Sequence, residues 1–306
     1  MQKPVPSQIA IIGPTACGKS ALALELAGEF DGIILSLDSL ALYREIDIAS
    51  AKPTPEERGA IPHYGIDLID PDRPFDVTRF ADLYREVAAE AERSGRPLII
   101  VGGSSFYLKI LLEGLSPLPS IDRSVRRRVD ALLARPDEAR ALLTERAPLF
   151  ARRLAPSDRY RMEKGLLILL QTGRDPEEYF RDNPPKPVID APLPLYEITM
   201  PRERLRDRII RRTDAMLRMG LIDEVTGLEY RYGRAPQSMK AIGIVEVLAY
   251  LDGRLDLRQM REKIITNTAR LAKRQSTFNR SQFVDVCRED KEKLKEKIRA
   301  ELQRGR

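Results

Sequence analysis

A segment near the start of the chain combines residue types at a spacing that suits phosphate binding. Residues 13–20 read Gly-Pro-Thr-Ala-Cys-Gly-Lys-Ser and fit the pattern G-x-x-x-x-G-K-[ST]. In this pattern glycines let backbone N–H groups turn toward phosphate oxygens, and the helix that follows adds positive partial charge at its N-terminus. Lys19 would reach the terminal phosphate, and the Ser20 hydroxyl would hold a magnesium ion. We therefore predict a phosphate-binding loop; the alternative is a tight strand-to-helix turn without a ligand.

A carboxylate at the end of the next apolar run is a second candidate for chemistry. Asp38 directly follows the run at 33–37, and Ser39 follows Asp38. A carboxylate in this place would act as a magnesium ligand or as a general base that takes a proton from an acceptor. The alternative for Asp38 is a capping role at a helix N-terminus, because Asp and Ser are favoured caps.

The elements that must position these residues read as a parallel sheet with crossover helices. Apolar runs at 9–12, 32–37 and 98–101 predict strands, and helices are expected at 18–28 and 76–94. Ligands of such sheets bind beyond the carboxyl ends of the strands. We therefore expect three separate segments to meet beside the phosphate loop. They are the loop itself, Asp38-Ser39 and Gly102-Gly103-Ser104.

The middle of the chain departs from this alternation. Prolines at 117 and 119 end the pattern, and a charged, leucine-rich helical stretch follows until a proline cluster at 184–187. We predict an α/β fold in which a parallel-sheet core with a phosphate loop carries a helical insertion and a helical C-terminal region. The expected parts are 1–120 (core), 121–190 (insertion) and 191–306 (core with C-terminal helices). The charged tail from 289 is expected to be a helix that frays.

Composition narrows the class of protein. The 306 residues carry 52 Lys and Arg against 46 Asp and Glu, and the arginines cluster at 123–128, 152–164, 202–212 and 270–280. Such clusters suit a nucleic-acid backbone or a diphosphate, although solvated helix faces also produce them. No apolar run is long enough to span a membrane, and Met1–Gln8 lacks a signal-peptide core. With two cysteines and no disulfide framework, we expect a cytoplasmic protein, most simply a monomer.

Beyond these patterns, the chain resembles the tRNA dimethylallyltransferases, also called isopentenyl-tRNA transferases. Short blocks match the family in order over nearly the whole sequence. The blocks are GPTACGKS at 13–20, DSLALY at 38–43, DIASAKP at 47–53, PHYGID at 62–67, VGGS at 101–104, LEGL at 112–115, SMKAIG at 238–243 and LAKRQSTF at 271–278.

The resemblance implies a prenyl transfer reaction. A dimethylallyl group would pass from dimethylallyl diphosphate to the exocyclic N6 amine of the adenine at position 37, adjacent to the tRNA anticodon, with Mg²⁺ as cofactor. The loop would then hold a diphosphate and not a nucleoside triphosphate. The chemistry agrees, because cations must neutralise the leaving diphosphate and a carboxylate helps a weakly nucleophilic aromatic amine. The implied catalytic residues are Asp38 as general base, Lys19 and Ser104, the last standing where the family has Thr.

The same resemblance assigns binding residues by position. The donor and its metal would be held by Gly13, Pro14, Thr15, Ala16, Cys17, Gly18, Lys19, Ser20, Arg208 and Arg212, with Ser20 as the metal ligand. The tRNA anticodon arm would be contacted by Asp38, Ser39, Leu40, Ala41, Ser104, Arg126, Tyr160, Arg161, Lys164, Lys240, Ala241, Ile242, Gly243, Lys273, Arg274, Gln275, Thr277, Phe278 and Arg280. For any single arginine here, a solvent-facing helix charge is the alternative.

The departures from the family concern the tRNA-contacting blocks. Ala41 stands where Gln is common, Lys164 and Leu167 replace Arg and Glu, and Ile244, Ala269 and Phe278 replace Tyr, Arg and Trp. Lysine keeps the charge of arginine without its bidentate geometry. The phosphate and base chemistry is therefore expected to be intact, with part of the tRNA contacts rewritten.

Three other functions share some of these features. A prenyltransferase acting on free adenylate would keep the loop and Asp38 but has no need of the insertion or the basic C-terminal helices. A phosphate-loop kinase or NTPase would hydrolyse or transfer from ATP. A tRNA-binding protein without activity would not need the catalytic residues. Products formed from dimethylallyl diphosphate with tRNA or with AMP discriminate among these functions.

Overall fold

The computed structural model describes residues 8–155 and 158–304 and divides the chain into two compact units. The first unit joins Met1–Leu111 to Ile189–Arg306, and the second is Leu112–Val188. The sequence predicts a helical insertion at 121–190. The second unit of the structure begins earlier than this prediction, inside the last turn of a helix. That helix, α4 (Ser105–Glu113), contains the division point.

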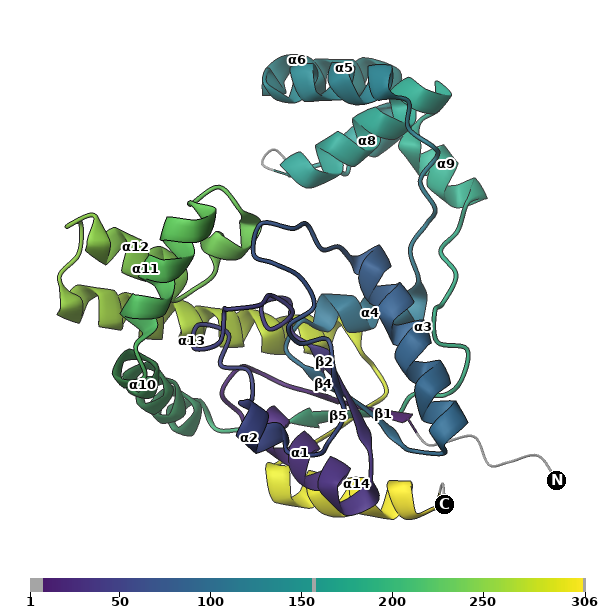
Figure 1. Cartoon of the computed structure of the whole chain (residues 1–306). Helices are drawn as coiled ribbons and strands as arrows, with labels where there is room; N and C mark the ends of the chain where they lie inside the picture. The colour runs from purple at the N-terminus through teal and green to yellow at the C-terminus, as the bar shows by residue number, and fades with distance from the viewer. Residues whose placement is uncertain (1–7, 156–157, 305–306) are drawn as a thin grey trace. The chain divides into compact units, whose positions relative to one another are not determined.

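Within the described residues, the first unit contains one six-stranded parallel sheet of order β3-β2-β4-β1-β5-β6. Figure 1 labels its inner strands β2, β4, β1 and β5. Its strands are β1 (Gln8–Ile12), β2 (Ile33–Leu37), β3 (His63–Tyr64), β4 (Leu98–Gly102), β5 (Leu195–Ile198) and β6 (Val286–Glu289). The register places Ile99 beside Ile9 on one side and beside Ile34 on the other. The parallel α/β core predicted from the sequence is therefore confirmed.

Two helices cover one face of this sheet. The helix α1 (Lys19–Phe30) and the C-terminal helix α14 (Lys291–Arg304) pack side by side (Figure 1). Leu294 and Ile298 of α14 are fully buried together with Leu22 and Leu26 of α1. The expectation of a frayed tail was wrong for 291–304, because three-to-four-residue spacing gives this charged helix an apolar stripe that the sheet layer buries.

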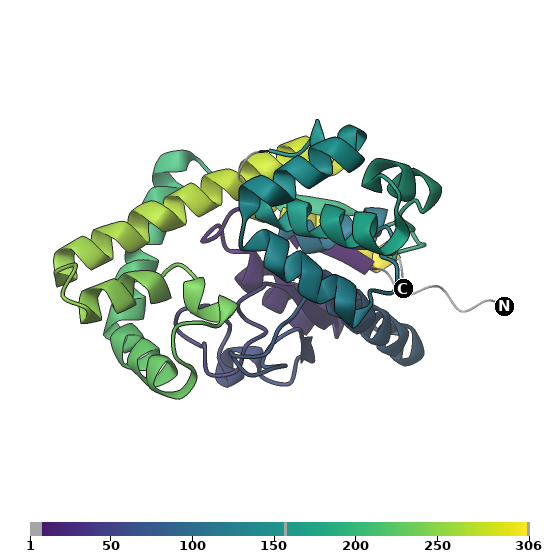
Figure 2. The ribbon, with the colours of Figure 1, turned by 90° about the horizontal axis from the view of Figure 1, so that it is seen from above.

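Other helices complete the first unit. The helix α3 (Val77–Ser94) packs against β2, and the short α2 (Pro55–Arg58) precedes β3. After β5 the chain forms α10 (Arg202–Arg218), α11 (Leu221–Tyr232), the 3₁₀ turn η1 (Gln237–Lys240), α12 (Ile244–Leu251) and α13 (Leu257–Gln282). Figure 2 shows α13 as one long helix, which runs past α12 and α10. A separate apolar cluster holds α10–α13 to the segment that follows β2.

The second unit is helical and has its own core. It contains α5 (Arg123–Leu133), α6 (Pro136–Arg146), α7 (Pro148–Ala151), α8 (Arg159–Thr172) and α9 (Pro176–Asp182). Val129, Leu143 and Leu166 are fully buried in this core. The segment that leads into this unit lies beside the segment that leads out of it. A Cβ atom on Gly114 would lie 1.9 Å from the Lys186 carbonyl oxygen, so only glycine fits there. No helix among residues 8–155 and 158–304 is long and apolar enough to cross a membrane.

Candidate active site

The phosphate loop lies between β1 and α1, as the sequence predicts. Gly18 precedes the first residue of α1 with φ 102°, a conformation that glycine adopts without strain. Lys19 is buried, and its Nζ donates a hydrogen bond to the Pro14 carbonyl at 2.8 Å. The ammonium is thereby held at the loop, where an anion at the helix N-terminus would meet it.

Two arginines of α10 reach the loop from another part of the chain. Arg208 and Arg212 are four residues apart and so share one helix face. Arg208 Nε donates to the Ala16 carbonyl at 2.6 Å, and Arg212 Nη1 donates to Thr15 Oγ1 at 3.2 Å. Both arginines that were predicted to lie at the diphosphate therefore contact the phosphate loop.

Gln275 of α13 joins the loop to the end of β4. Its Oε1 accepts from the Thr15 N–H at 2.8 Å, and its Nε2 donates to the Gly103 carbonyl at 3.0 Å. A side chain on Gly103 would lie 2.4 Å from that Nε2, so the glycine makes room for the amide. One side chain thus fixes the distance between two segments that line the site.

Asp38 stands at the end of β2, next to Ser104 at the end of β4. Its Oδ1 accepts from the Leu40 N–H at 2.8 Å and the Ala41 N–H at 3.3 Å, while Oδ2 accepts no hydrogen bond from the described residues. The chain continues as a turn and not as a helix, so Asp38 caps a turn with Oδ1 and leaves Oδ2 without a hydrogen bond from the described residues. Ser104 Oγ accepts from the Ser39 N–H at 3.1 Å, which ties the two strand ends together.

Burial shifts the pKa values of two further groups near Asp38. Burial lowers the pKa of Arg212, and the Asp38 carboxylate opposes that shift. The pKa of Tyr107 is raised to about 12, mainly by burial and further by nearby Tyr43 and by Asp76 and Asp38. Tyr107 therefore keeps its proton at neutral pH and remains a hydrogen-bond donor.

Two adjoining cavities meet at these residues. The first, about 510 Å³, is lined by the phosphate loop and by basic side chains that include Lys19, Arg208 and Arg212. The second, about 610 Å³, has a more apolar wall that includes Met216, Leu271 and Phe278. The residues that line both are Thr15, Asp38, Ser50, Gly103, Arg212 and Gln275. A charged group in the first cavity and an apolar or aromatic group in the second would thus meet beside Asp38.

The first cavity suits a metal ion that takes few oxygen ligands from the protein and most of them from a bound phosphate compound and water. Ser20, in the first turn of α1, is exposed and lines this cavity with Asp38 and Glu57. The described residues contain no group of three or more His, Cys, Asp or Glu side chains that could bind a metal by themselves. Magnesium commonly takes one or two protein oxygens and completes its shell with phosphate oxygens and water. The residues present therefore fit a magnesium ion that arrives with a diphosphate.

Most other residues predicted at the site also line a cavity. In the first they are Ala16, Gly18 and Ala41, and in the second Ser39, Leu40, Ser104, Lys240, Ala241, Ile242, Arg274 and Phe278. Gly13, Pro14, Cys17, Gly243, Lys273, Thr277 and Arg280 line neither. Lys273, Thr277 and Arg280 lie on the exposed side of α13.

Two of the residues predicted to contact a ligand are buried. The Cys17 thiol is buried and its N–H donates to the Pro14 carbonyl at 3.3 Å, so its contact with the donor stays a prediction. Ala41 is only 3 % exposed and lines the phosphate cavity, so it does not face the second cavity with Ser39 and Leu40. The small side chain allows the turn after Asp38 to pack inward.

The predicted tRNA contacts of the insertion lie together in the second unit. Arg126 of α5 pairs with Glu163 of α8 at 2.9 Å, and Lys164 Nζ lies 5.3 Å from the centre of the Tyr160 ring. Tyr160 and Arg161 are exposed at the start of α8. These groups form a basic and aromatic surface on two packed helices.

Sequence reasoning missed several residues of the first cavity, among them Ser50, Lys52, His63 and Arg211. Three of the four lie in or beside blocks 47–53 and 62–67, which matched the family but received no role. The motif itself was the available signal. Glu224, which holds this segment from α11, had no such signal, because its partners lie more than 170 residues away in the sequence.

Comparisons with known proteins agree on one family. The model of the IPP transferase family matches residues 41–282. The chain is 51% identical over 288 residues to a tRNA dimethylallyltransferase of Sulfurovum sp., which covers 94% of this chain and 95% of that protein. It superimposes on the tRNA isopentenylpyrophosphate transferase of Bacillus halodurans with a TM-score of 0.72 at 31% identity, covering 98% and 97% of the two chains.

A second solved structure is a eukaryotic dimethylallyltransferase acting on tRNA. It matches with a TM-score of 0.82 at 25% identity, over 93% of this chain and 74% of that one. The family match spans most of the sequence, and the relatives align over nearly their full length. This chain belongs to the IPP transferase family.

Proposed function

We propose that this protein is a tRNA dimethylallyltransferase. It transfers the dimethylallyl group of dimethylallyl diphosphate to the exocyclic N6 amine of the adenine at position 37, next to the tRNA anticodon, and releases diphosphate. The observation that carries the proposal is the pair of cavities that meet at Asp38, Thr15 and Arg212. One cavity is basic and suits a diphosphate, and the other has an apolar wall that suits a prenyl chain and a base.

The donor side neutralises the leaving group. As the bond between the allylic carbon and the diphosphate oxygen breaks, negative charge grows on the diphosphate. Lys19, Arg208 and Arg212 stabilise that charge from fixed positions, which lowers the barrier. The Ser20 hydroxyl would hold a magnesium ion, which would supply further positive charge to the leaving diphosphate.

The acceptor side activates the amine. The adenine must leave its stack to reach a cavity, as bases do in other enzymes that modify them. The N6 nitrogen forms the new bond to carbon and transfers one proton to Asp38 Oδ2. The Ser104 hydroxyl and Gln275 keep the strand ends in place around it. Phe278 offers an aromatic face in the second cavity on which a base can stack.

The polynucleotide partner is the tRNA anticodon arm. The arginine-rich surface of α5 and α8 and the exposed basic side of α13 suit its phosphates. A mononucleotide acceptor would not use either surface. The monomeric state and the cytoplasmic location remain predictions.

The test is a product analysis. The protein is incubated with dimethylallyl diphosphate and magnesium, together with either tRNA or AMP, and the products are weighed by mass spectrometry after nuclease digestion. A dimethylallyl-adenosine at position 37 of tRNA is the expected result. Prenylated AMP with unchanged tRNA would support the adenylate enzyme, and Lys19-dependent hydrolysis of ATP would support an NTPase.

A further inference from the structure

The segment 46–52, here called the strap, follows the Asp38 turn and forms part of the cavity walls. Ala51 and Lys52 line the first cavity, Ala49 lines the second, and Ser50 lines both. The Ser50 carbonyl accepts a hydrogen bond from Arg212 Nη2 at 3.4 Å. Arg212 is thus held from two sides, by Thr15 of the phosphate loop and by the strap.

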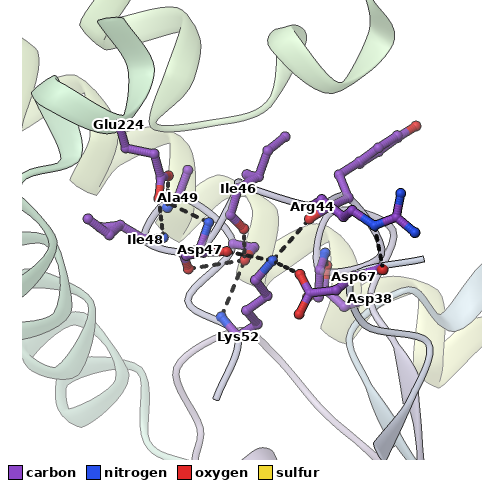
Figure 3. Close-up of polar contacts among 12 residues, drawn as sticks. Asp38, Arg44, Ile46, Asp47, Ile48, Ala49, Lys52, Asp67 and Glu224 are labelled. Atoms are coloured by element: carbon purple, nitrogen blue, oxygen red, sulfur yellow. Dashed lines mark hydrogen bonds and ion pairs between the residues drawn. The ribbon is translucent and has the colours of Figure 1, made fainter. Parts of the chain in front are cut away.

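Glu224 of α11 holds the strap through its backbone. One carboxylate oxygen accepts from the Asp47 N–H at 3.0 Å and the Ile48 N–H at 2.7 Å, and the other accepts from the Ala49 N–H at 2.9 Å (Figure 3). Hydrogen bonds to an ionised carboxylate are stronger than those between neutral groups. Glu224 therefore fixes the N–H groups of three consecutive residues, of which the last, Ala49, directly precedes Ser50.

Lys52 closes the other end of the strap. Its Nζ donates to the Tyr43 carbonyl at 3.0 Å and pairs with Asp47 at 2.6 Å and with Asp67, which follows β3 (Figure 3). The Lys52 side chain is only 5 % exposed, whereas its partners Asp47 and Asp67 are 65 % and 37 % exposed. Opening the strap would therefore take a buried ammonium away from its charged partners.

The backbone of this region is strained in a way that requires such support. Glu45, Ala51 and Asp67 have φ of 63°, 49° and 54°, values that residues other than glycine seldom adopt. Strain of this kind persists only where surrounding contacts over-determine the conformation, and it is concentrated at functional sites. Ser50 adds a further restraint, since its Oγ donates to the Ile46 carbonyl at 2.5 Å.

We propose that Glu224, together with the Lys52–Asp67 pair, positions Arg212 for the diphosphate by holding the strap in this conformation. Glu224 acts through the backbone and touches neither donor nor acceptor, so it is a positioning residue. The proposal rests on the proposed function only in taking a diphosphate as the ligand of the first cavity. A brace that served stability alone would not need to turn the Ser50 carbonyl toward Arg212.

A double-mutant cycle tests the proposal. Inorganic diphosphate binding with magnesium is measured by calorimetry for wild type, Glu224→Gln, Arg212→Lys and the double variant. Glutamine keeps the size of the side chain but turns an amide N–H toward a backbone N–H. We expect Glu224→Gln to weaken binding by about tenfold, the scale at which supporting residues act on a bound ligand. In the Arg212→Lys background the same change should weaken binding less than about twofold, because its effect passes through Arg212.

Leu302→Ala is the matched control. Leu302 of α14 is buried in a different apolar cluster from the strap, so its truncation lowers stability without changing diphosphate affinity. If Glu224→Gln does not fold, Asp67→Asn takes its place in the cycle. This substitution removes the negative charge that pairs with Lys52. Equal losses in both Arg212 backgrounds, or no loss in either, would overturn the proposal. A wild-type protein that binds no diphosphate would instead overturn the proposed function.

Discussion

The Gln275 side-chain oxygen accepts a hydrogen bond from the Thr15 N–H at 2.8 Å, across 260 positions of sequence. Gln275 lies on α13, the helix that also carries Arg274 and Phe278 into the second cavity. The phosphate loop is therefore tied to the helix that lines the second cavity. A sequence block that resembles a tRNA-contacting block of the family thus has a structural link to the phosphate loop.

Replacing Gln275 by Leu should impair the donor side of the reaction. Leucine has a similar size but neither accepts from Thr15 nor donates to the Gly103 carbonyl, so two polar backbone groups lose their partner. We expect kcat/KM for dimethylallyl diphosphate to fall by about tenfold. Ser281→Ala, on the exposed last turn of the same helix, is the control and should be unchanged. Steady-state kinetics at saturating tRNA measure both; an unaltered Gln275→Leu enzyme would show that the link is incidental.

Asp38→Asn should slow chemistry while leaving the turn intact. The asparagine oxygen can still accept from the Leu40 and Ala41 N–H groups, but the amide cannot take a proton. We expect the single-turnover rate to fall by about 10²–10⁴-fold, the usual contribution of a general base. Diphosphate affinity should change little. Near-normal turnover would reduce Asp38 to a capping residue.

Arg288→Leu should destabilise the first unit without touching the cavities. Arg288 Nε pairs with buried Glu197 at 2.9 Å, and its Nη2 donates to the Phe283 carbonyl at the end of α13. The Glu197 side chain is 5 % exposed and that of Arg288 is 30 % exposed. Removing Arg288 leaves the buried carboxylate without its charged partner, which costs up to about 3–5 kcal/mol. Urea unfolding measures the loss. Arg85→Ala, from an exposed pair with Asp82, should change stability by less than about 1 kcal/mol.

The arginines of α5 should contribute to the salt dependence of tRNA binding. Arg127 and Arg128 are exposed, whereas Arg126 is partly neutralised by Glu163. Each phosphate contact changes the slope of log K against log salt by roughly 0.7–0.9. Replacing Arg127 and Arg128 by Ala should therefore flatten the slope by up to about two such steps while diphosphate binding is kept. An unchanged slope would place the tRNA elsewhere.

The sequence predicted those parts of the structure that depend on local patterns. The runs that form β1, β2 and β4 are buried on both faces, so they read as continuous apolar segments. The edge strands β3 and β6 are short and only half-buried, and they were not predicted. Their pairing depends on the neighbouring strand more than on their own residues.

The same distinction holds within the site. The phosphate loop and Asp38 were predicted because each lies in a contiguous motif beside its strand. The role of Glu224 depends on three backbone N–H groups of a loop far away in sequence. Nothing in the pattern of α11 distinguishes this glutamate from Glu229, which forms an ion pair with Arg234 on the surface. Only the tertiary structure gives these two residues different roles.

His63, the one histidine of the chain, should make stability and diphosphate binding depend on pH. It lies on β3 and lines the phosphate cavity, with Nδ1 3.1 Å from the Ile61 carbonyl oxygen. Burial lowers the pKa of its imidazole, Arg58 lowers it further, and the Ile61 carbonyl opposes the shift. Between the folded pKa and the unfolded value of about 6.5, the unfolded chain binds more protons. The free energy of unfolding should therefore fall as pH decreases below about 6.5, and His63→Gln should remove this part of the slope.

A bound diphosphate should reverse the shift at His63. An anion in the same cavity favours the charged imidazolium, so it raises the pKa of His63 toward or above its usual value. Below pH of about 6.5, diphosphate binding should then be accompanied by the uptake of a proton by His63. The affinity for diphosphate should increase as pH decreases over the range in which the diphosphate itself stays ionised. Calorimetry in two buffers of different ionisation enthalpy measures the proton uptake, and the NMR signal of the single imidazole reports its pKa with and without the ligand. His63→Gln should abolish the histidine part of the uptake while the ligand's own protonation remains. An imidazole whose pKa does not move on binding would show that the anion lies away from β3, at the opposite end of the cavity.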